Sequence, residues 1–285
     1  MIDTDLFWWL ANTRYQMYEN RLLAGVPVPS GDPILDNNRF TNTFRAADRV
    51  SQRLIRLQQE GPPDEHSLVF RTLLFKVFNR EETWDYLEEC DLTTHWDPSA
   101  LKSVLDSYEG PIFSGAYVMV NKMLEGVPKH HFYIDAIDGV LKYNLGAVLQ
   151  AQSLDELVRV LRSVPGFGPF LSYQYAIDLN YSNLFRFSEN GAVTAGPGSL
   201  RGVEKIFGSS RMAESKIRQL WEERDRGPLL MGVRPMHLID VQNMLCEYDK
   251  YTRVAHGESG RMKQRYRPNP EPLPDPVWPE SWVIA

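Results

Sequence analysis

The residues best suited to chemistry lie in one segment near the end of the chain, residues 237–252. Four polar residues follow one another there at steps of three, four and three, namely Asp240, Asn243, Glu247 and Lys250. Since residues three or four apart share a helix face, the spacing predicts one face with two carboxylates, an amide and an amine. Such a face suits acid or base catalysis by Glu247 or Asp240. The alternative is a solvated stripe held by a Glu247–Lys250 pair.

A second polar stripe lies on a helix predicted from about Asn42 to Gln59. Its members are again three or four residues apart: Asn42, Arg45, Arg49, Gln52 and Arg56. Arginine forks and amides bind phosphates and base edges, which makes Arg45 and Arg49 candidate DNA contacts. Asp48 follows Arg45 by three residues and could orient that arginine or act as an acid itself. Ordinary helix-surface charge is the alternative.

The turn Pro165-Gly166-Phe167-Gly168-Pro169 joins two predicted helices. The first starts with a Ser153/Glu156 capping box, and the second begins at Pro169, whose missing N–H is not needed there. Glycine reaches backbone conformations closed to other residues, and a helix N-terminus attracts anions. The turn at 164–170 is therefore a candidate clamp on a DNA phosphate, with a tight helix–helix corner as the alternative.

Other candidate residues accompany these three segments. Gly196, Gly198 and Ser199 form a second glycine-rich turn at a helix start and could contact another phosphate. Asp178 is a further candidate acid, with helix capping as the alternative. Residues that could line a pocket for an extruded base are Asn42, Gln174, Asn180, Asn243, Trp8 and Tyr15. Aromatic residues such as the last two more often belong to a core.

Two further motifs predict what the chain lacks. His130-His131 with Asp135 and Asp138 matches no zinc signature, so we expect solvated loop residues and no metal. The sequence AGPGSLRG lacks the G-K-[ST] ending of a phosphate-binding P-loop, so we expect no nucleotide cofactor.

Composition limits the class of protein. The 285 residues are 43% hydrophobic and carry a net charge of -6, which argues against a nonspecific nucleic-acid binder. Neither a long apolar run nor a basic signal-peptide start is present, and Cys90 and Cys246 have no metal spacing. We therefore expect a cytoplasmic protein without a membrane segment, and no obligatory protein partner is evident.

Apolar residues recur at helical spacing along most of the chain, which predicts a mainly α fold. A first helix is expected over residues 5–24, between Thr4 as N-cap and Gly25. Further helices are expected near residues 67–79, 81–90, 98–108, 113–124, 134–150, 153–164, 199–207, 211–225 and 236–252. We interpret residues 1–252 as one helical domain and residues 253–285 as a basic, then proline-rich tail.

The hairpin resembles the helix-hairpin-helix of DNA glycosylases. The whole chain resembles a family of DNA base hypermodification proteins, the glutamyl/putrescinyl thymine pyrophosphorylases and the helical domain of 5-hydroxymethyluracil DNA kinases. The likeness is carried by three blocks of sequence: residues 32–55, residues 164–182 with 195–207, and residues 240–253. It implies a glycosylase-like fold with two helical lobes around a DNA-facing cleft. The catalytic aspartate that familiar glycosylases carry after the hairpin has no counterpart here, because the region from 193 holds no acid before Glu204.

This resemblance implies double-stranded DNA with modified bases as the partner. The leading hypothesis is a DNA glycosylase that flips out a hypermodified pyrimidine, such as one of phage DNA, and cleaves its N-glycosidic bond in a defence role. The alternative is a transferase that displaces pyrophosphate from an activated 5-hydroxymethyluracil with an amine or amino acid. A third hypothesis is a non-catalytic reader of modified DNA.

Overall fold

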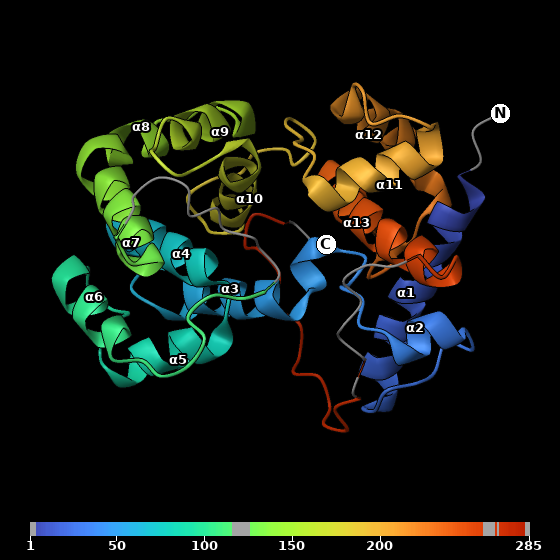
Figure 1. Cartoon of the computed structure of the whole chain (residues 1–285), viewed down its shortest axis with the longest axis horizontal. Coiled ribbons are helices and arrows are strands. Elements are labelled where there is room, and N and C mark those ends of the chain that lie inside the picture. Colours follow the sequence, from blue (N-terminus) through green and yellow to red (C-terminus); the bar gives the residue numbers. More distant parts are fainter. Residues whose placement is uncertain (1–3, 116–125, 259–265, 267, 283–285) are drawn as a thin grey trace. The chain divides into compact units, whose positions relative to one another are not determined.

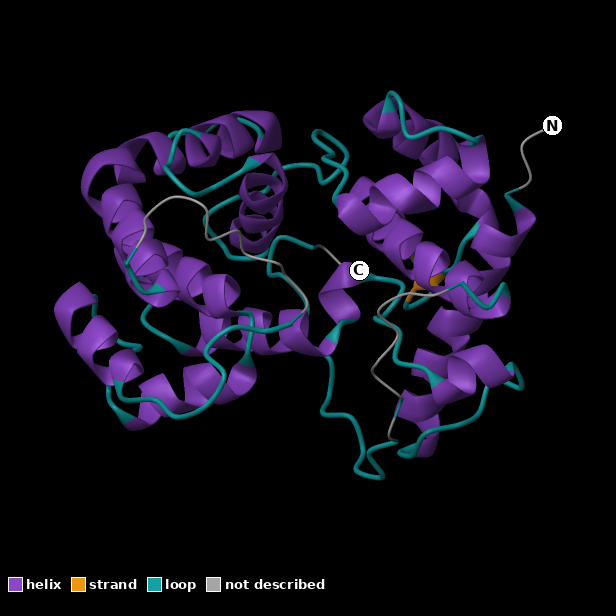
Figure 2. Ribbon diagram, in the orientation of Figure 1, coloured by secondary structure: helices purple, strands orange, loops and turns teal. Residues whose placement is uncertain are grey.

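The computed structural model describes residues 4–115, 126–258, 266 and 268–282. The chain forms two compact units: unit 1 comprises residues 1–48, 193–276 and 284–285, and unit 2 comprises residues 49–192 and 277–283. The described residues are mainly helical, which confirms the predicted fold class (Figures 1 and 2). One antiparallel hairpin, β1 (Leu229–Leu230) with β2 (Arg234–Pro235), was not predicted, because two residues are too short for a pattern.

Unit 1 is built around one central helix, α13 (Leu238–Ala255). The elements that contact it are α1 (Asp5–Ala24), α2 (Pro33–Asn37), α11 (Pro197–Phe207), α12 (Ala213–Glu222) and the short 3-10 helix η1 (Arg45–Ala47). A second 3-10 helix, η3 (Arg224–Arg226), follows α12. Because α13 packs against so many neighbours, twelve of its residues are buried, including three with a charged side chain.

The contact between α11 and α13 depends on two glycines. A Cβ atom on Gly202 would lie 2.2 Å from the carbonyl oxygen of Leu245, and one on Gly198 would lie 2.9 Å from Sγ of Cys246. Both distances are far below a normal contact, so only glycine permits this approach of the two helices.

Unit 2 has its own central helix, α4 (Glu65–Phe78), which is buried at every position from Ser67 onwards. Its neighbours are α3 (Arg49–Glu60), α5 (Glu81–Glu89), α7 (Lys129–Gly139), α10 (Pro169–Asn180) and the π-helical segment η2 (Val140–Asn144). Helix α6 (Pro98–Asp106) packs on α7, while α9 (Leu154–Arg162) packs on α10 and on α8 (Leu145–Leu149). Helix α4 thus lies in the core of unit 2, and its polar residues Arg71, Thr72 and Lys76 are buried with the apolar ones.

Local signals fixed several helix ends as predicted. Helix α1 spans residues 5–24, and Gly25 closes it in the left-handed conformation with φ 70° while its N–H donates to the carbonyl of Arg21. Ser153 caps α9 by accepting the N–H of Glu156 at 3.2 Å. Helix α10 begins at Pro169, with Gly168 as its N-cap. The helix–turn–helix around residues 164–170 is therefore confirmed as local structure.

The helix predicted from Asn42 is wrong over its first seven residues. The regular helix starts only at Arg49, because Asn42 bonds within its own loop: its side-chain oxygen accepts the N–H of Phe44 at 3.3 Å and its amide donates to the carbonyl of Ala47 at 3.4 Å. Such local bonds compete with a helix. Asn42 and Arg45 therefore do not extend the stripe of Arg49, which belongs to unit 2.

The loop predicted around His130-His131 is also wrong, because both histidines lie in the first turn of α7. From α7 the chain continues as helix through η2 and α8, so the helix expected over 134–150 starts five residues earlier. The helix predicted over 113–124 falls largely on residues 116–125, which lie outside the described residues, and 113–115 are not helical. No helix in the described part of the chain is long and apolar enough to cross a membrane.

Candidate active site

The polar face predicted on α13 exists, and it lies against the loop of residues 39–48 within unit 1. Glu247 is 4% exposed, and its Oε2 accepts the backbone N–H of Thr41 at 3.1 Å and the ammonium of Lys250 at 2.7 Å. Lys250 also donates to the carbonyl of Arg39 at 3.2 Å, and its Nζ lies 5.2 Å from the centroid of the Phe40 ring. Among the described residues, both of these donors bond Oε2 of Glu247 and not Oε1.

Asp240 occupies the start of the same face, with both oxygens engaged. Oδ1 accepts the N–H of Arg45 at 2.8 Å, and Oδ2 accepts the N–H of His237, the N-cap of α13, at 2.9 Å. Burial raises the pKa of Asp240, whereas Arg234, these two backbone N–H groups and Arg45 oppose that rise. Asp240 thus joins the helix start to the 3-10 helix η1, which is a positioning role.

Asn243 adds two bonds from α13 to the loop, and Asp48 adds one within the loop. The side-chain amide of Asn243 donates to Oγ1 of Thr41 and to the carbonyl of Asn42, both at 3.3 Å. Oδ1 of Asp48 accepts the N–H of Asn42 at 3.4 Å, and its side chain is only half-buried. All four residues predicted on one helix face therefore bond the loop of residues 39–48, and Asn243 bonds the predicted pocket residue Asn42 there.

Cations surround these carboxylates. Arg14 of α1 donates to the carbonyl of Phe40 at 3.3 Å; burial lowers the pKa of its guanidinium, and the charges of Asp48 and Glu247 oppose that change. Arg234 approaches the N-cap of α13, where its Nη2 lies 3.2 Å from Nδ1 of His237. Burial, together with Arg234 and Arg224, lowers the pKa of His237 to about 3, so this imidazole is neutral at physiological pH. Three carboxylates thus lie among several cations.

Comparison with known proteins gives this site its context. The sequence model of the family described as "5-hmdU DNA kinase, helical domain" matches residues 2–261. The chain belongs to this family. The 5-hmdU DNA kinase of Bacillus phage SP10 is 22% identical over 295 residues, which cover 90% of this chain and 46% of that protein. The chain therefore spans less than half the length of this relative. No solved structure matches.

Several other predicted site residues lie in unit 2 and are described within that unit. Asp178 is fully buried with its Oδ2 3.5 Å from Nζ of Lys76, and the amide of Asn180 donates to the carbonyl of Phe187 at 3.0 Å. Gln174 is buried on the same helix, α10. Arg49 pairs with Glu81 at 3.3 Å.

The two glycine-rich turns differ in what their glycines do. Gly166 has φ 89°, and a Cβ there would lie 2.4 Å from the Phe132 ring, so the local structure itself requires glycine at this position. Gly168 is exposed, and a Cβ there would meet nothing within 4 Å. In the second turn Gly196 is the N-cap of α11, Gly198 packs on α13, and the hydroxyl of buried Ser199 donates to the carbonyl of Gly196.

The aromatic residues suggested for base stacking lie in the core of unit 1. Trp8 is 2% exposed and donates its indole N–H to Glu223 at 3.2 Å, and the hydroxyl of Tyr15 accepts the N–H of Met231 at 2.8 Å. Their surroundings agree with the core alternative stated above.

Sequence reasoning missed Arg14 and Thr41, which contact the cluster from α1 and the loop. Neither stands in a motif, and both lie far from α13 in the sequence; Thr41, for example, is 206 residues from Glu247. The signal that could have found Arg14 is weak: an arginine in the middle of the aromatic first helix.

Proposed function

We propose that this chain acts on an activated 5-hydroxymethyluracil in DNA and replaces its pyrophosphate with an amine or amino acid. The observation that carries the proposal is the family match over residues 2–261. The name of the phage relative denotes phosphate transfer to hydroxymethylated DNA. Phosphorylation turns the hydroxyl of the hydroxymethyl group into a leaving group that an amine can displace from the methylene carbon. The chain itself has no G-K-[ST] sequence, so the phosphorylation step would need another catalyst.

The chemistry of the α13 cluster supports this reaction. The amine nitrogen attacks the exocyclic methylene carbon, the carbon–oxygen bond breaks, and its electron pair leaves with pyrophosphate. The nitrogen must lose a proton, and Oε1 of Glu247 is the acceptor we assign to it. Arg14 and Lys250 lie beside this carboxylate and can balance the charge of the departing pyrophosphate. Asp48 and Asp240 would then position the loop and the helix rather than react.

Base excision is less well supported. Cleavage of an N-glycosidic bond needs a negative group beneath the sugar and little additional positive charge. Here the buried carboxylates stand among several cations, and neither the family nor the relative is described as a glycosylase. We therefore place the transferase first and base excision second.

The partner in this proposal is double-stranded DNA, held through the hairpin of a helix-hairpin-helix arrangement like that of glycosylases. The support is local: Gly168 is exposed at the start of α10, and Arg159 and Arg162 form the basic last turn of α9 just before the turn. Exposed arginines beside a helix N-terminus suit a DNA phosphate.

The test is to incubate the protein with DNA that contains 5-(pyrophosphoryloxymethyl)uracil and with an amine such as putrescine or glutamate. Released pyrophosphate and a mass gain of the nucleoside are expected. Glu247→Gln should lower this transfer about a hundredfold or more, because the proton acceptor is lost, while DNA binding persists. Glu204→Gln, which alters an exposed glutamate of α11 in the same unit, is the matched control and should keep full activity.

Three outcomes would count against the proposal. Free base with abasic sites would favour base excision, and binding without any product would favour a reader of modified DNA. Full transfer by the Glu247→Gln variant would remove Glu247 as the base even if the reaction itself is right.

A further inference from the structure

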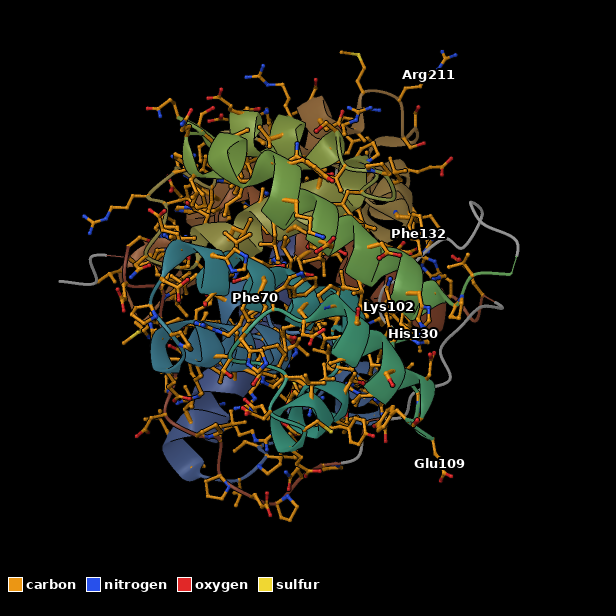
Figure 3. All side chains as sticks on the ribbon, turned by 90° about the vertical axis from the view of Figure 1, so that its left-hand side faces the viewer. Phe70, Lys102, Glu109, His130, Phe132 and Arg211 are labelled. Carbon is orange, nitrogen blue, oxygen red and sulfur yellow. The ribbon has the colours of Figure 1, made fainter. Side chains whose placement is uncertain are left out.

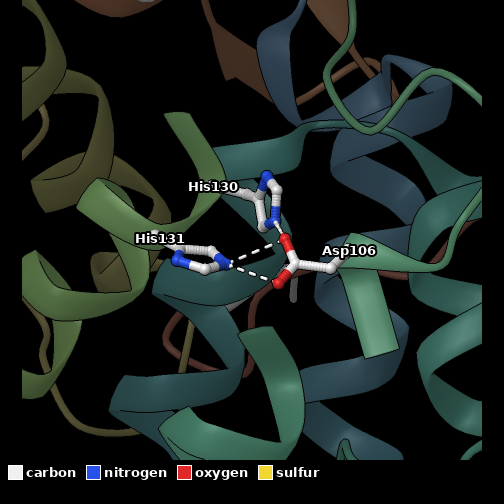
Figure 4. A group of neighbouring side chains, drawn as sticks. All are labelled: Asp106, His130 and His131. Carbon is white, nitrogen blue, oxygen red and sulfur yellow. Dashed lines mark hydrogen bonds and ion pairs between the residues drawn. The ribbon is translucent and has the colours of Figure 1, made fainter. Parts of the chain in front are cut away.

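We propose that Asp106, His130 and His131 of unit 2 form a binding site for one divalent transition-metal ion of the zinc class. Nε2 of His130 and Nε2 of His131 each lie 2.9 Å from Oδ1 of Asp106, and Nε2 of His131 lies 3.0 Å from Oδ2 (Figure 4). The ligand atoms of all three residues lie within 4.8 Å of one another. Two imidazole nitrogens and a carboxylate are a common ligand set for zinc.

The geometry is close to what a metal requires. Zinc binds nitrogen and carboxylate oxygen at about 2.0–2.2 Å, so two ligand atoms of a tetrahedral site stand about 3.3 Å apart. The observed separations of 2.9 and 3.0 Å need to widen by only a few tenths of an ångström. Both rings would then carry their proton on Nδ1 and offer the Nε2 lone pair to the ion.

Two packed helices bring the ligands together. Asp106 is the last residue of α6, the histidines lie in the first turn of α7, and these helices contact each other. The two rings are perpendicular with centroids 4.6 Å apart, so they reach the same carboxylate from different directions. Figure 3 looks onto this side of unit 2, with His130 and Lys102 labelled.

The charges favour a cation at this position. A carboxylate at the C-terminal end of a helix faces the negative end of the helix dipole, and the last turn of α6 holds no basic residue. The nearby lysines are engaged elsewhere: Lys102 pairs with Asp135, and Lys142 pairs with Asp138 at 2.7 Å.

These two ion pairs also explain why Asp135 and Asp138 are not ligands, although they stand nearest in the sequence. The carboxylate that completes the site comes from 24 residues before His130. The prediction of no metal considered Asp135 and Asp138 and did not consider Asp106.

The site has room for a further ligand. The side chain of Asp106 is 48% exposed, that of His131 24% and that of His130 11%, so the cluster is open on the carboxylate side. Three protein ligands leave the fourth position of a tetrahedral ion for water or for an anionic oxygen. The two imidazoles select zinc, cobalt(II), nickel(II) or iron(II) over magnesium and calcium.

The experiment is calorimetric titration of the untagged full chain with zinc chloride after dialysis against a chelator. One equivalent should bind, cobalt(II) should give the visible absorption bands of a low-symmetry site, and magnesium should give no heat. Zinc at a hundredfold excess over its Kd should raise the thermal midpoint of unfolding by about 5–10 °C. His131→Asn and Asp106→Asn should each weaken zinc binding about a hundredfold or more, because each removes a direct ligand.

His95→Asn is the matched control, because His95 is an exposed histidine of unit 2 outside the cluster. Its affinity for zinc should equal that of the unaltered chain. Absence of stoichiometric binding, or equal affinity in the His131→Asn, Asp106→Asn and control variants, would overturn the proposal. Circular dichroism identifies a variant that fails to fold, and the remaining substitution then decides. The readout is binding, so it does not depend on the transferase activity proposed above.

Discussion

The buried pair of Asp178 and Lys76 allows a direct test of whether the carboxylate of Asp178 is structural or catalytic. Lys76 Nζ lies 3.5 Å from Asp178 Oδ2 in the core of unit 2, and the side chains are 3% and 0% exposed. At an effective dielectric constant of about 20, two unit charges at this distance attract by about 5 kcal/mol. Lys76 also donates to Oδ1 of Asn79 at 2.8 Å, so the ammonium lies in a polar setting of its own.

The perturbation is a double-mutant cycle of Lys76→Met, Asp178→Asn and the two together. Lys76→Met leaves a buried carboxylate without this partner and should lower the free energy of unfolding by about 3–5 kcal/mol. Asp178→Asn should cost about as much, because the buried ammonium then lacks this carboxylate. The double variant should be more stable than the sum of the two losses predicts, by roughly 3 kcal/mol or more.

Urea unfolding followed by circular dichroism measures these free energies. Additive losses, within about 0.5 kcal/mol, would refute the ion-pair reasoning. The transfer assay gives the second readout: at a temperature where Asp178→Asn is folded, it should retain activity. Loss of activity in a folded Asp178→Asn protein would return this residue to the list of candidate acids.

Three further predictions concern the glycines and the cap of α13. Gly166→Ala should lower the free energy of unfolding by about 1–3 kcal/mol, because φ is 89° and Phe132 blocks the new methyl group. Gly168→Ala should change the free energy of unfolding by less than about 0.5 kcal/mol. It should nevertheless weaken DNA binding about tenfold in a filter-binding assay. Equal DNA affinity in the second variant would make the turn a structural corner only. Gly202→Ala should lower stability by about 2 kcal/mol in urea unfolding, because the clash with α13 exceeds the gain in helix propensity. The pKa of His237 falls from 6.5 to about 3 on folding, so the free energy of unfolding should fall as the pH drops below 6.5, by about 2 kcal/mol at pH 5. In His237→Asn the free energy of unfolding, measured at several pH values, should depend less on pH.

The parts of the fold that the sequence predicts are those decided by neighbouring residues. Helix α1 was predictable to the residue because Gly25 ends it locally, and α9 because Ser153 caps it. The loop at residues 42–48 was not predictable in this way, because its apolar and polar residues repeat as in a helix. The side chain of Asn42 nevertheless bonds the backbone of Phe44 and Ala47 and holds the segment as a loop. For His130, Pro128 just before the helix was an available start signal that favoured α7.

The candidate site divides in the same way. The face of Asp240, Asn243 and Glu247 follows from helical periodicity alone. That Thr41 supplies an N–H to Glu247 does not, because 206 residues separate the two and only tertiary packing joins them. The same holds for Asp106, whose partnership with two histidines depends on how α6 meets α7.

The two units are completed at different times during synthesis, because each is built from separate segments of the chain. Residues 49–192, nearly all of unit 2, are complete before any of the second half of unit 1 has been made. These residues of unit 2 can therefore collapse early around α4. Residues 1–48 lack their packing partner, helix α13, until that helix has been synthesised. Glu247 can contact Thr41 only after α13 has been synthesised. A nascent chain arrested before that point would hold residues 49–192 of unit 2 and none of the chemistry assigned to unit 1.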